Sequence, residues 1–152
     1  DRQKKRISKI ILENMFGTLT NKRIAILGFA FKSNTNDTRE SPAISICKDL
    51  LEEGCEISIY DPKVTQENIQ DAFSQENETI KKEDWSFASS ILNAAANADA
   101  ILILTEWGEF KDLNWNELTK IMRKPSWLFD TRSITNFDDA KSCGINVWRI
   151  GT

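Results

Sequence analysis

Two short segments of the sequence contain side chains that could bind an anionic ligand. The first runs from residue 28 to residue 42 and carries Lys32 and Arg39, together with serine, threonine and asparagine side chains. A lysine offers a compact positive charge, and an arginine offers a planar fork that can donate to two oxygens of a phosphate or carboxylate. The second segment carries Arg132, shortly after Asp130. Lys32, Arg39 and Arg132 are therefore candidates for anion binding.

The same cations have a simpler interpretation, because most charged loop residues of soluble proteins are only solvated. The two cations of the first segment could pair with Asp37 and Glu40, which lie in the same stretch. In the second segment, Arg132 could form an ion pair with Asp130 or with a neighbour. The spacing of the residues leaves both interpretations open.

The composition excludes several kinds of chemistry. The chain of 152 residues has no histidine, so it cannot form a Ser-His-Asp triad or a histidine-ligated metal site, and we predict no metal centre. Its cysteines, Cys47, Cys55 and Cys143, are widely spaced and indicate reduced thiols in a cytoplasmic protein. With 20 basic and 23 acidic residues the net charge is −3, which argues against a nucleic-acid partner. No apolar run reaches the ~18 residues that cross a membrane, and no signal peptide is recognisable.

Short apolar runs alternate with segments of helical periodicity along most of the chain. The runs typical of buried strands are residues 22–28, 57–62, 100–105, 127–130 and 145–150. The segments with helical periodicity are residues 42–53, 85–97, 114–122 and 138–142. We expect residues 63–83, which are largely polar, to form an excursion on the surface, with at most a short strand near 79–81. The alternation predicts an α/β fold with a doubly wound, Rossmann-like parallel sheet of about six strands, in the order 3-2-1-4-5-6, and helices on both faces.

The beginning of the chain also has helical periodicity. Its apolar residues recur at helical spacing, namely Ile7, Ile10, Ile11, Met15 and Phe16. Four cations, at positions 2, 4, 5 and 6, come before them, although the first turn of a helix favours anions. The segment is thus either the interior of a longer helix or a basic terminus with no further meaning.

In a doubly wound sheet, ligands bind beyond the carboxyl ends of the strands. The loops at those ends are residues 28–40, 61–63, 105–110 and 130–133. This topology brings Lys32 and Arg132 to the same edge of the sheet. A dinucleotide-binding loop would carry GxGxxG after the first strand, but Gly28 stands alone, so we do not expect NAD to bind here in the standard way.

Three more residues at this edge could carry function or only structure. Asp61 follows the second strand, where a Rossmann fold places its ribose-binding acid, but without the glycine fingerprint a turn with Pro62 is the better interpretation. Glu106 could be a functional acid or could cap a following helix. Trp107 is expected to fill core space.

Five motifs of the chain resemble, in order, the C-terminal domain of UDP-glucose 6-dehydrogenases, members of the UDP-glucose/GDP-mannose dehydrogenase family. They are AILGFAFK at 25–32, TNDTRESP at 35–42, YDPKV at 60–64, TEWGEFK at 105–111 and FDTR at 129–132. The resemblance extends over essentially residues 1–152. It implies that residues 1–20 are the end of a helix connecting two domains and that residues 21–152 are a UDP-binding C-terminal domain.

The resemblance also implies an activity for the whole enzyme. The family oxidises UDP-glucose to UDP-glucuronate in two steps, reduces two NAD molecules and uses a cysteine nucleophile. That cysteine belongs to a Gly-Gly-x-Cys segment that has no match here, so no catalytic residue is assigned. NAD would be bound mainly by an N-terminal domain that this chain lacks. We therefore expect the isolated chain to be inactive, and the full-length enzyme to be a cytoplasmic homo-oligomer.

Carried over by position, the resemblance assigns Phe31 and Lys32 to the nucleotide sugar and Arg132 to the substrate from the other loop. Arg39 would reach NAD across the cleft between the domains. Thr131 stands where family members often have glycine, which leaves the local turn open. The alternatives are a stand-alone nucleotide-sugar-binding module without catalysis, or the same domain of a dehydrogenase for UDP-N-acetylated sugars or GDP-mannose.

Overall fold

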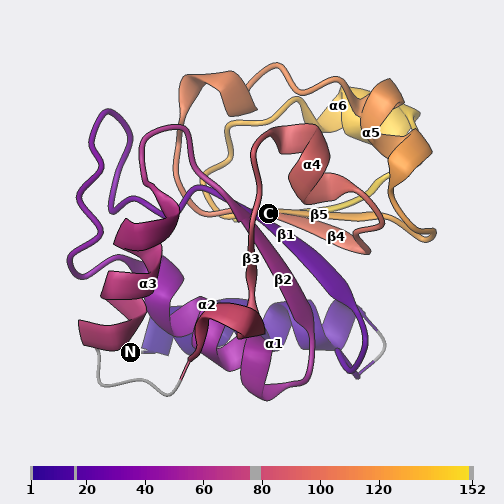
Figure 1. The fold of residues 1–152 in the computed structure, drawn as a ribbon. Coiled ribbons are helices and arrows are strands. Elements are labelled where there is room, and N and C mark those ends of the chain that lie inside the picture. The colour runs from indigo at the N-terminus through magenta and orange to yellow at the C-terminus, as the bar shows by residue number, and fades with distance from the viewer. Residues whose placement is uncertain (1, 16, 76–79, 151–152) are drawn as a thin grey trace.

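A single parallel sheet of six strands organises the chain (Figure 1). The computed structural model describes residues 2–15, 17–75 and 80–150. The strands are β1 (Arg23–Leu27), β2 (Glu56–Tyr60), β3 (Ser86–Phe87), β4 (Ala100–Ile103), β5 (Trp127–Asp130) and β6 (Asn146–Arg149). Their order is β3-β2-β1-β4-β5-β6, and every neighbouring pair is parallel. The predicted doubly wound order is confirmed.

Helices cover both faces of this sheet. They are α1 (Arg2–Asn14), α2 (Pro42–Glu52), α3 (Gln66–Gln75), α4 (Ile91–Ala95), α5 (Trp115–Ile121) and α6 (Phe137–Ser142). Figure 1 shows α1 and α2 on one face, and α4, α5 and α6 on the other. Two short 3-10 helices span Lys82–Asp84 and Gly108–Phe110. Within the described residues, no helix is long and apolar enough to span a membrane.

The two central strands are apolar on both sides, because each face of the sheet is covered. In β1 and β4, Ile24, Ile26, Ile101 and Ile103 are completely buried. Helix α2 begins where predicted: the Ser41 hydroxyl accepts a hydrogen bond from the Ala43 amide, and Pro42 occupies the first helical position.

The helical periodicity at the start of the chain is confirmed as α1, which packs beside α2. Its residues Ile7, Ile11 and Met15 are buried, and Phe16 lies outside the described residues. The Ser8 hydroxyl donates to Asp49 of α2 at 3.1 Å. This helix therefore shares one hydrophobic core with α2.

The segment from residue 63 to residue 98 differs most from the prediction. Residues 63–83 are not only a surface excursion, because they contain α3, whose Ile69, Ala72 and Phe73 are buried. The ring of Phe73 meets Phe29 edge-on with centroids 5.4 Å apart, and meets Trp85 at 5.8 Å. This packing holds a helix whose outward face is polar throughout.

The third strand and the following helix were also predicted in the wrong places. The strand is β3, at residues 86–87, and not near 79–81; Ile80 is in no helix or strand, and Thr79 lies outside the described residues. Helix α4 spans only residues 91–95 and not 85–97, because the Ser90 hydroxyl caps it by accepting from the Asn93 amide. Alanine content favoured a longer helix, but pairing of β3 with β2 keeps the preceding residues extended.

Candidate functional site

The buried carboxylate of Asp61 anchors the loop that follows β1. Its Oδ2 accepts hydrogen bonds from the amides of Phe29 and Ala30 at 2.8 and 3.0 Å. Its Oδ1 accepts from the amides of Lys63 and Val64 at 2.8 and 3.1 Å. The side chain is only 4% exposed, so these bonds are shielded from water. Asp61 thus fixes both its own turn, as the sequence suggested, and a loop far from it in the sequence.

The same contacts determine whether the loop after β1 can bind a dinucleotide such as NAD. In a standard NAD site the amides after the first strand point at the pyrophosphate. Here the amides of Phe29 and Ala30 donate to Asp61 instead, and the carboxylate would also repel a phosphate placed there. The loop after β1 therefore does not fit the pyrophosphate of NAD.

Three consecutive residues after β4 hold the loop after β1. The Thr105 hydroxyl donates to the Ala30 carbonyl at 3.0 Å. Glu106 accepts through Oε1 from the Ser33 amide at 3.2 Å, and the Trp107 indole donates to Asp61 at 3.1 Å. Trp107 is buried, as predicted, but it also serves as a hydrogen-bond donor. The segment 105–107 is therefore a clamp on the loop that carries Lys32, and we call it the β4 clamp.

A glycine is required where this clamp meets β1. Gly28 has φ +97°, and a Cβ added to it would lie 2.5 Å from Cβ of Thr105 and 2.7 Å from its backbone nitrogen. Any other residue would be strained in its backbone and would push the clamp away. The lone glycine of the first motif therefore allows close approach of two chain segments.

The loop after β5 is built around Asp130, the last residue of that strand. Its two carboxylate oxygens accept from the amides of residues 132 to 135 and from the hydroxyl of Thr135, at 2.6–3.0 Å. Asp130 is completely buried. Because the turn already occupies both oxygens of its carboxylate, Asp130 does not pair with the guanidinium of Arg132. The residue with positive φ in this turn is Ser133, at +55°, and not Thr131, so the turn does not require a glycine at position 131.

The guanidinium of Arg132 is held from two sides. Its Nε donates to the carbonyl of Leu104 at 3.0 Å, and its Nη1 lies 3.6 Å from Oε2 of Glu106. Arg132 thus forms an ion pair, as one of the two interpretations of the sequence allowed, and its partner is Glu106 of the β4 clamp. A cavity of about 190 Å³ adjoins Arg132, with Ile7 and Ile46 in its mostly apolar wall.

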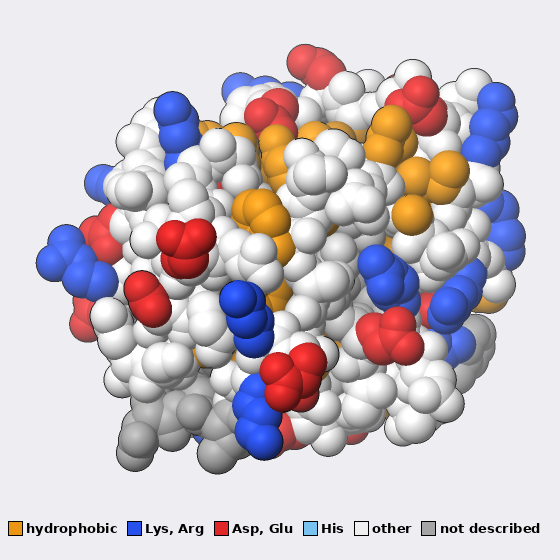
Figure 2. Space-filling view, viewed as in Figure 1, with side chains coloured by type: hydrophobic (Ala, Val, Ile, Leu, Met, Phe, Trp, Pro, Cys, Tyr) orange, Lys and Arg blue, Asp and Glu red, His pale blue; other side chains and the backbone are white. Residues whose placement is uncertain are grey.

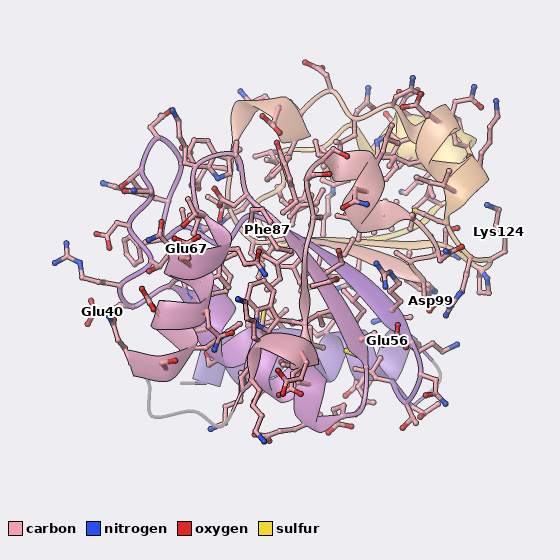
Figure 3. The ribbon with its side chains drawn as sticks, viewed as in Figure 1. Glu40, Glu56, Glu67, Phe87, Asp99 and Lys124 are labelled. Atoms are coloured by element: carbon pink, nitrogen blue, oxygen red, sulfur yellow. The ribbon has the colours of Figure 1, made fainter. Side chains whose placement is uncertain are left out.

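Lys32 and Phe31 lie exposed on the loop after β1, and the Phe31 side chain is 43% exposed. Among the described residues, Lys32 forms no ion pair. Both side chains are thus available to a ligand at the carboxyl edge of the sheet. Figure 3 shows Glu40 on the outside of the same loop, whereas Glu56 and Asp99 lie at the opposite, amino edge of the sheet.

Arg39 and Asp37 form a bidentate ion pair on the outer surface of that loop. Arg39 donates from Nε and Nη2 to the two oxygens of Asp37, each at 3.0 Å. These hydrogen bonds lower the pKa of the Asp37 carboxyl from 3.8 to about 2. The Arg39 side chain is 83% exposed, so its pairing with Asp37 is a surface interaction that a ligand could replace. Figure 2 shows acidic and basic side chains interspersed over the visible face of the molecule.

The cysteines lie away from this edge. Burial raises the pKa of Cys47 strongly and that of Cys55 to about 12, so both are protonated thiols without access to a substrate. Cys55 and Cys143 precede β2 and β6, at the amino ends of the strands. No group of three potential metal ligands occurs in the part of the chain that the structure describes.

The sequence of this domain matches a known family. A profile of the UDP binding domain of the UDP-glucose/GDP-mannose dehydrogenase family matches residues 25–137, which is more than half of the chain. The chain belongs to this family. Two relatives are UDP-glucose 6-dehydrogenase 4 of Arabidopsis thaliana, 42% identical over 168 aligned positions, and UDP-glucose 6-dehydrogenase of Drosophila melanogaster, 44% identical over 153. The alignments cover 99% and 98% of this chain but 34% and 32% of the relatives, so the chain spans about a third of their length.

Solved structures of dehydrogenases share the fold. UDP-D-ManNAc dehydrogenase from Pyrococcus horikoshii superimposes with a TM-score of 0.71 at 28% identity, over 99% of this chain and 30% of that one. NDP-N-acetyl-D-galactosaminuronic acid dehydrogenase from Methanosarcina mazei gives 0.77 at 20% identity, over 99% and 29%. The second likeness, at its lower identity, supports the fold alone.

For this member of the UDP-glucose/GDP-mannose dehydrogenase family, the sequence prediction missed the link between the loop after β1 and the loop after β5. Glu106 touches both, yet its spacing from Ser33 and Arg132 gives no periodic signal. The only sequence hint was its place directly after a buried strand, at the ligand edge. The structure brings Lys32 and Arg132 to that edge as predicted, and it places Arg39 farther out on the loop, paired with Asp37.

Proposed function

We propose that this chain is the UDP-sugar-binding domain of an NAD-dependent UDP-glucose 6-dehydrogenase. The whole enzyme would oxidise UDP-glucose to UDP-glucuronate in two steps, with reduction of two NAD molecules. The observation that carries the proposal is sequence identity above 40% to enzymes of that name over nearly the whole chain. The arrangement of cations at the carboxyl edge of the sheet supports it, because a diphosphate needs such partners.

Each proposed site residue has a physical role that its surroundings allow. The exposed cation of Lys32 would approach the charged groups of the nucleotide sugar, and the half-exposed ring of Phe31 would cover its apolar surface. Arg132, from the second loop, would donate to the substrate. Arg39 would leave Asp37 and pair with NAD, which is held mainly by an N-terminal domain.

The proposal assigns the remaining parts of the reaction to the rest of the protein. Residues 1–20 would be the end of the helix that connects the two domains, and residues 21–152 the UDP-binding domain. The cysteine nucleophile and the NAD-binding loop would belong to parts of the full-length enzyme outside this chain. The full-length enzyme would be a homo-oligomer in the cytoplasm, with the N-terminal domain as the immediate partner of this one.

NADH formation by the full-length protein tests the proposal. With UDP-glucose we expect two NADH per UDP-glucuronate formed, and with the isolated chain we expect none. Turnover by the isolated chain would contradict the proposal that the nucleophile and the NAD-binding loop lie outside this chain. Absence of turnover by the full-length protein would contradict the proposed activity. Binding of UDP without any turnover in the full-length protein would instead indicate a nucleotide-sugar-binding module.

A dehydrogenase for an N-acetylated sugar is a second candidate, because the structure from Pyrococcus horikoshii carries that description. The full-length protein should therefore be assayed with UDP-glucose, UDP-N-acetylglucosamine, UDP-N-acetylmannosamine and GDP-mannose. We expect the highest kcat/KM with UDP-glucose. A higher value for any of the others would assign the enzyme to that substrate.

A further inference from the structure

Glu106 lies between the two loops that carry the proposed substrate cations. Its Oε1 accepts a hydrogen bond from the amide of Ser33, directly after Lys32, at 3.2 Å. Its Oε2 lies 3.6 Å from Nη1 of Arg132. One carboxylate thus contacts the loop after β1 with one oxygen and the loop after β5 with the other.

The backbone around Glu106 is fixed on both sides. Thr105 is completely buried and bonded to the Ala30 carbonyl, and Trp107 is buried and bonded to Asp61. Glu106 does not cap the following helix, since that 3-10 helix begins after Trp107 and has no side-chain cap. Its carboxylate therefore extends from a segment that is hydrogen-bonded on both sides and contacts partners on two other segments.

The contacts of Arg132 leave part of its guanidinium for a ligand. Nε donates to the Leu104 carbonyl and Nη1 faces Glu106, so two of the three nitrogens define the plane of the group. Nη2 has no partner among the described residues. A planar group held along one side and open on the other is arranged to donate to an oxyanion without first losing rotational freedom.

We infer that Glu106 is a positioning residue for substrate binding, which holds the Arg132 guanidinium and the Lys32 loop at a fixed separation so that both cations reach the diphosphate of the UDP-sugar. The inference rests on the proposed function. The side chains of Arg132 and Glu106 are 33% and 37% exposed, and ion pairs with that exposure contribute little to folding stability. Loss of Glu106 should therefore be visible in ligand binding much more than in unfolding.

The test measures UDP binding by calorimetry and UDP-glucose kinetics with the full-length protein. Glu106→Ala removes both contacts, and we expect it to raise the Kd for UDP and the KM for UDP-glucose roughly tenfold, as expected for a lost charged hydrogen bond. Glu106→Gln keeps an oxygen for the Ser33 amide and should have a smaller effect. The KM for NAD and the temperature of unfolding should stay unchanged.

A double-mutant cycle with Arg132 shows whether Glu106 acts through the arginine. If it does, Glu106→Ala lowers UDP affinity less in the Arg132→Ala background than in the wild-type protein, with only its effect through the Ser33 contact remaining, whereas independent effects would add in full. Glu109→Ala is the matched control. This neighbouring glutamate accepts a hydrogen bond from the Tyr60 hydroxyl at 2.5 Å and is bonded neither to the loop after β1 nor to the loop after β5. It should leave UDP affinity unchanged.

The results separate this inference from the proposed function. If Arg132→Ala weakens UDP binding but Glu106→Ala does not, Arg132 remains a substrate residue and the role of Glu106 is refuted. Additive losses, an equal loss in Glu109→Ala, or tighter binding in Glu106→Ala would refute it as well. If Arg132→Ala leaves UDP binding unchanged, both the substrate site and the role of Glu106 fail.

Discussion

The indole Nε1 of Trp107 donates a hydrogen bond to the carboxylate of Asp61 at 3.1 Å, across 46 positions of sequence. Asp61 follows β2 and Trp107 follows β4, and these two strands flank β1 in the sheet. The bond therefore passes over the carboxyl end of β1, where the loop carrying Lys32 begins. The same carboxylate oxygen also accepts hydrogen bonds from the amides of Phe29 and Ala30 in that loop. Asp61 and Trp107 together fix the base of the proposed substrate loop.

Asp61→Asn should destabilise the domain although the two side chains have the same shape. The amide nitrogen of the asparagine cannot accept, and it would face at least two of the five N–H donors that now point at the carboxylate, because each of its oxygens accepts two or three. We expect the free energy of unfolding in urea to fall by about 2–4 kcal/mol. The matched change Asp112→Asn, at an exposed position, should have little effect, and an equal loss there would contradict the role of Asp61.

Gly28→Ala should weaken the contact between β1 and the β4 clamp. The added Cβ would lie 2.5 Å from Cβ of Thr105, and φ of +97° is unfavourable for alanine. We expect a loss of about 2–4 kcal/mol of unfolding free energy, measured by chemical denaturation. Gly108→Ala is the control, since nothing lies within 4 Å of a Cβ there and its φ is not positive. Similar losses in both variants would show that the close approach at Gly28 is unimportant.

Arg132→Ala should weaken binding of the UDP-sugar to the full-length enzyme by about 1–3 kcal/mol, because a charged hydrogen bond is lost. Calorimetric titration with UDP-glucose measures the change. Arg123→Ala serves as the control, because that arginine pairs with Asp99 at 3.3 Å. Asp99 lies at the opposite edge of the sheet (Figure 3). An unchanged dissociation constant in Arg132→Ala would remove this residue from the site.

Arg39→Ala should raise the KM for NAD in the full-length enzyme and leave the KM for UDP-glucose unchanged. The reason is that the proposal directs this exposed guanidinium toward the other domain. Steady-state kinetics with each substrate varied in turn measure both constants. Lys32→Ala should show the reverse pattern, so the two variants control each other. An effect of Arg39→Ala confined to UDP-glucose would contradict the assignment.

The ion pair between Asp37 and Arg39 should be visible in a pH titration followed by NMR. The carboxyl pKa is lowered to about 2, chiefly by the side-chain hydrogen bonds of Arg39. A lowered pKa in the folded state means that the pair stabilises the fold above about pH 4, and that this contribution is lost as the pH falls toward 2.

In Arg39→Ala the Asp37 pKa should rise toward 3.8, though not fully, because the amide of residue 39 still donates to it at 2.9 Å. Lys32→Ala should move the same pKa much less, since Lys32 contributes the weakest of the effects that lower it. A pKa that stays near 2 in Arg39→Ala would show that the pair does not form in solution.

The regular core of the fold could be predicted from the sequence because its signals are local. The runs at 100–105 and 127–130 are apolar at nearly every position, which indicates strands buried on both faces. Helix α3 was missed because it buries only three of its ten residues, Ile69, Ala72 and Phe73, and exposes a polar surface. Its stability comes from aromatic contacts with Phe29 and Trp85, which no local pattern contains.

The sequence alone determined that Lys32 and Arg132 lie at one edge of the sheet, since parallel strands end at the same edge. It also placed Asp37 close enough to Arg39 to pair with it. Only the tertiary structure decided that Arg132 faces Glu106 and that Asp61 bonds to Trp107, because the order β2-β1-β4-β5 brings together segments that lie far apart in the chain. Which side chains pair across such distances depends on which strands are neighbours in the sheet. The hydrophobic periodicity of the sequence does not contain that information.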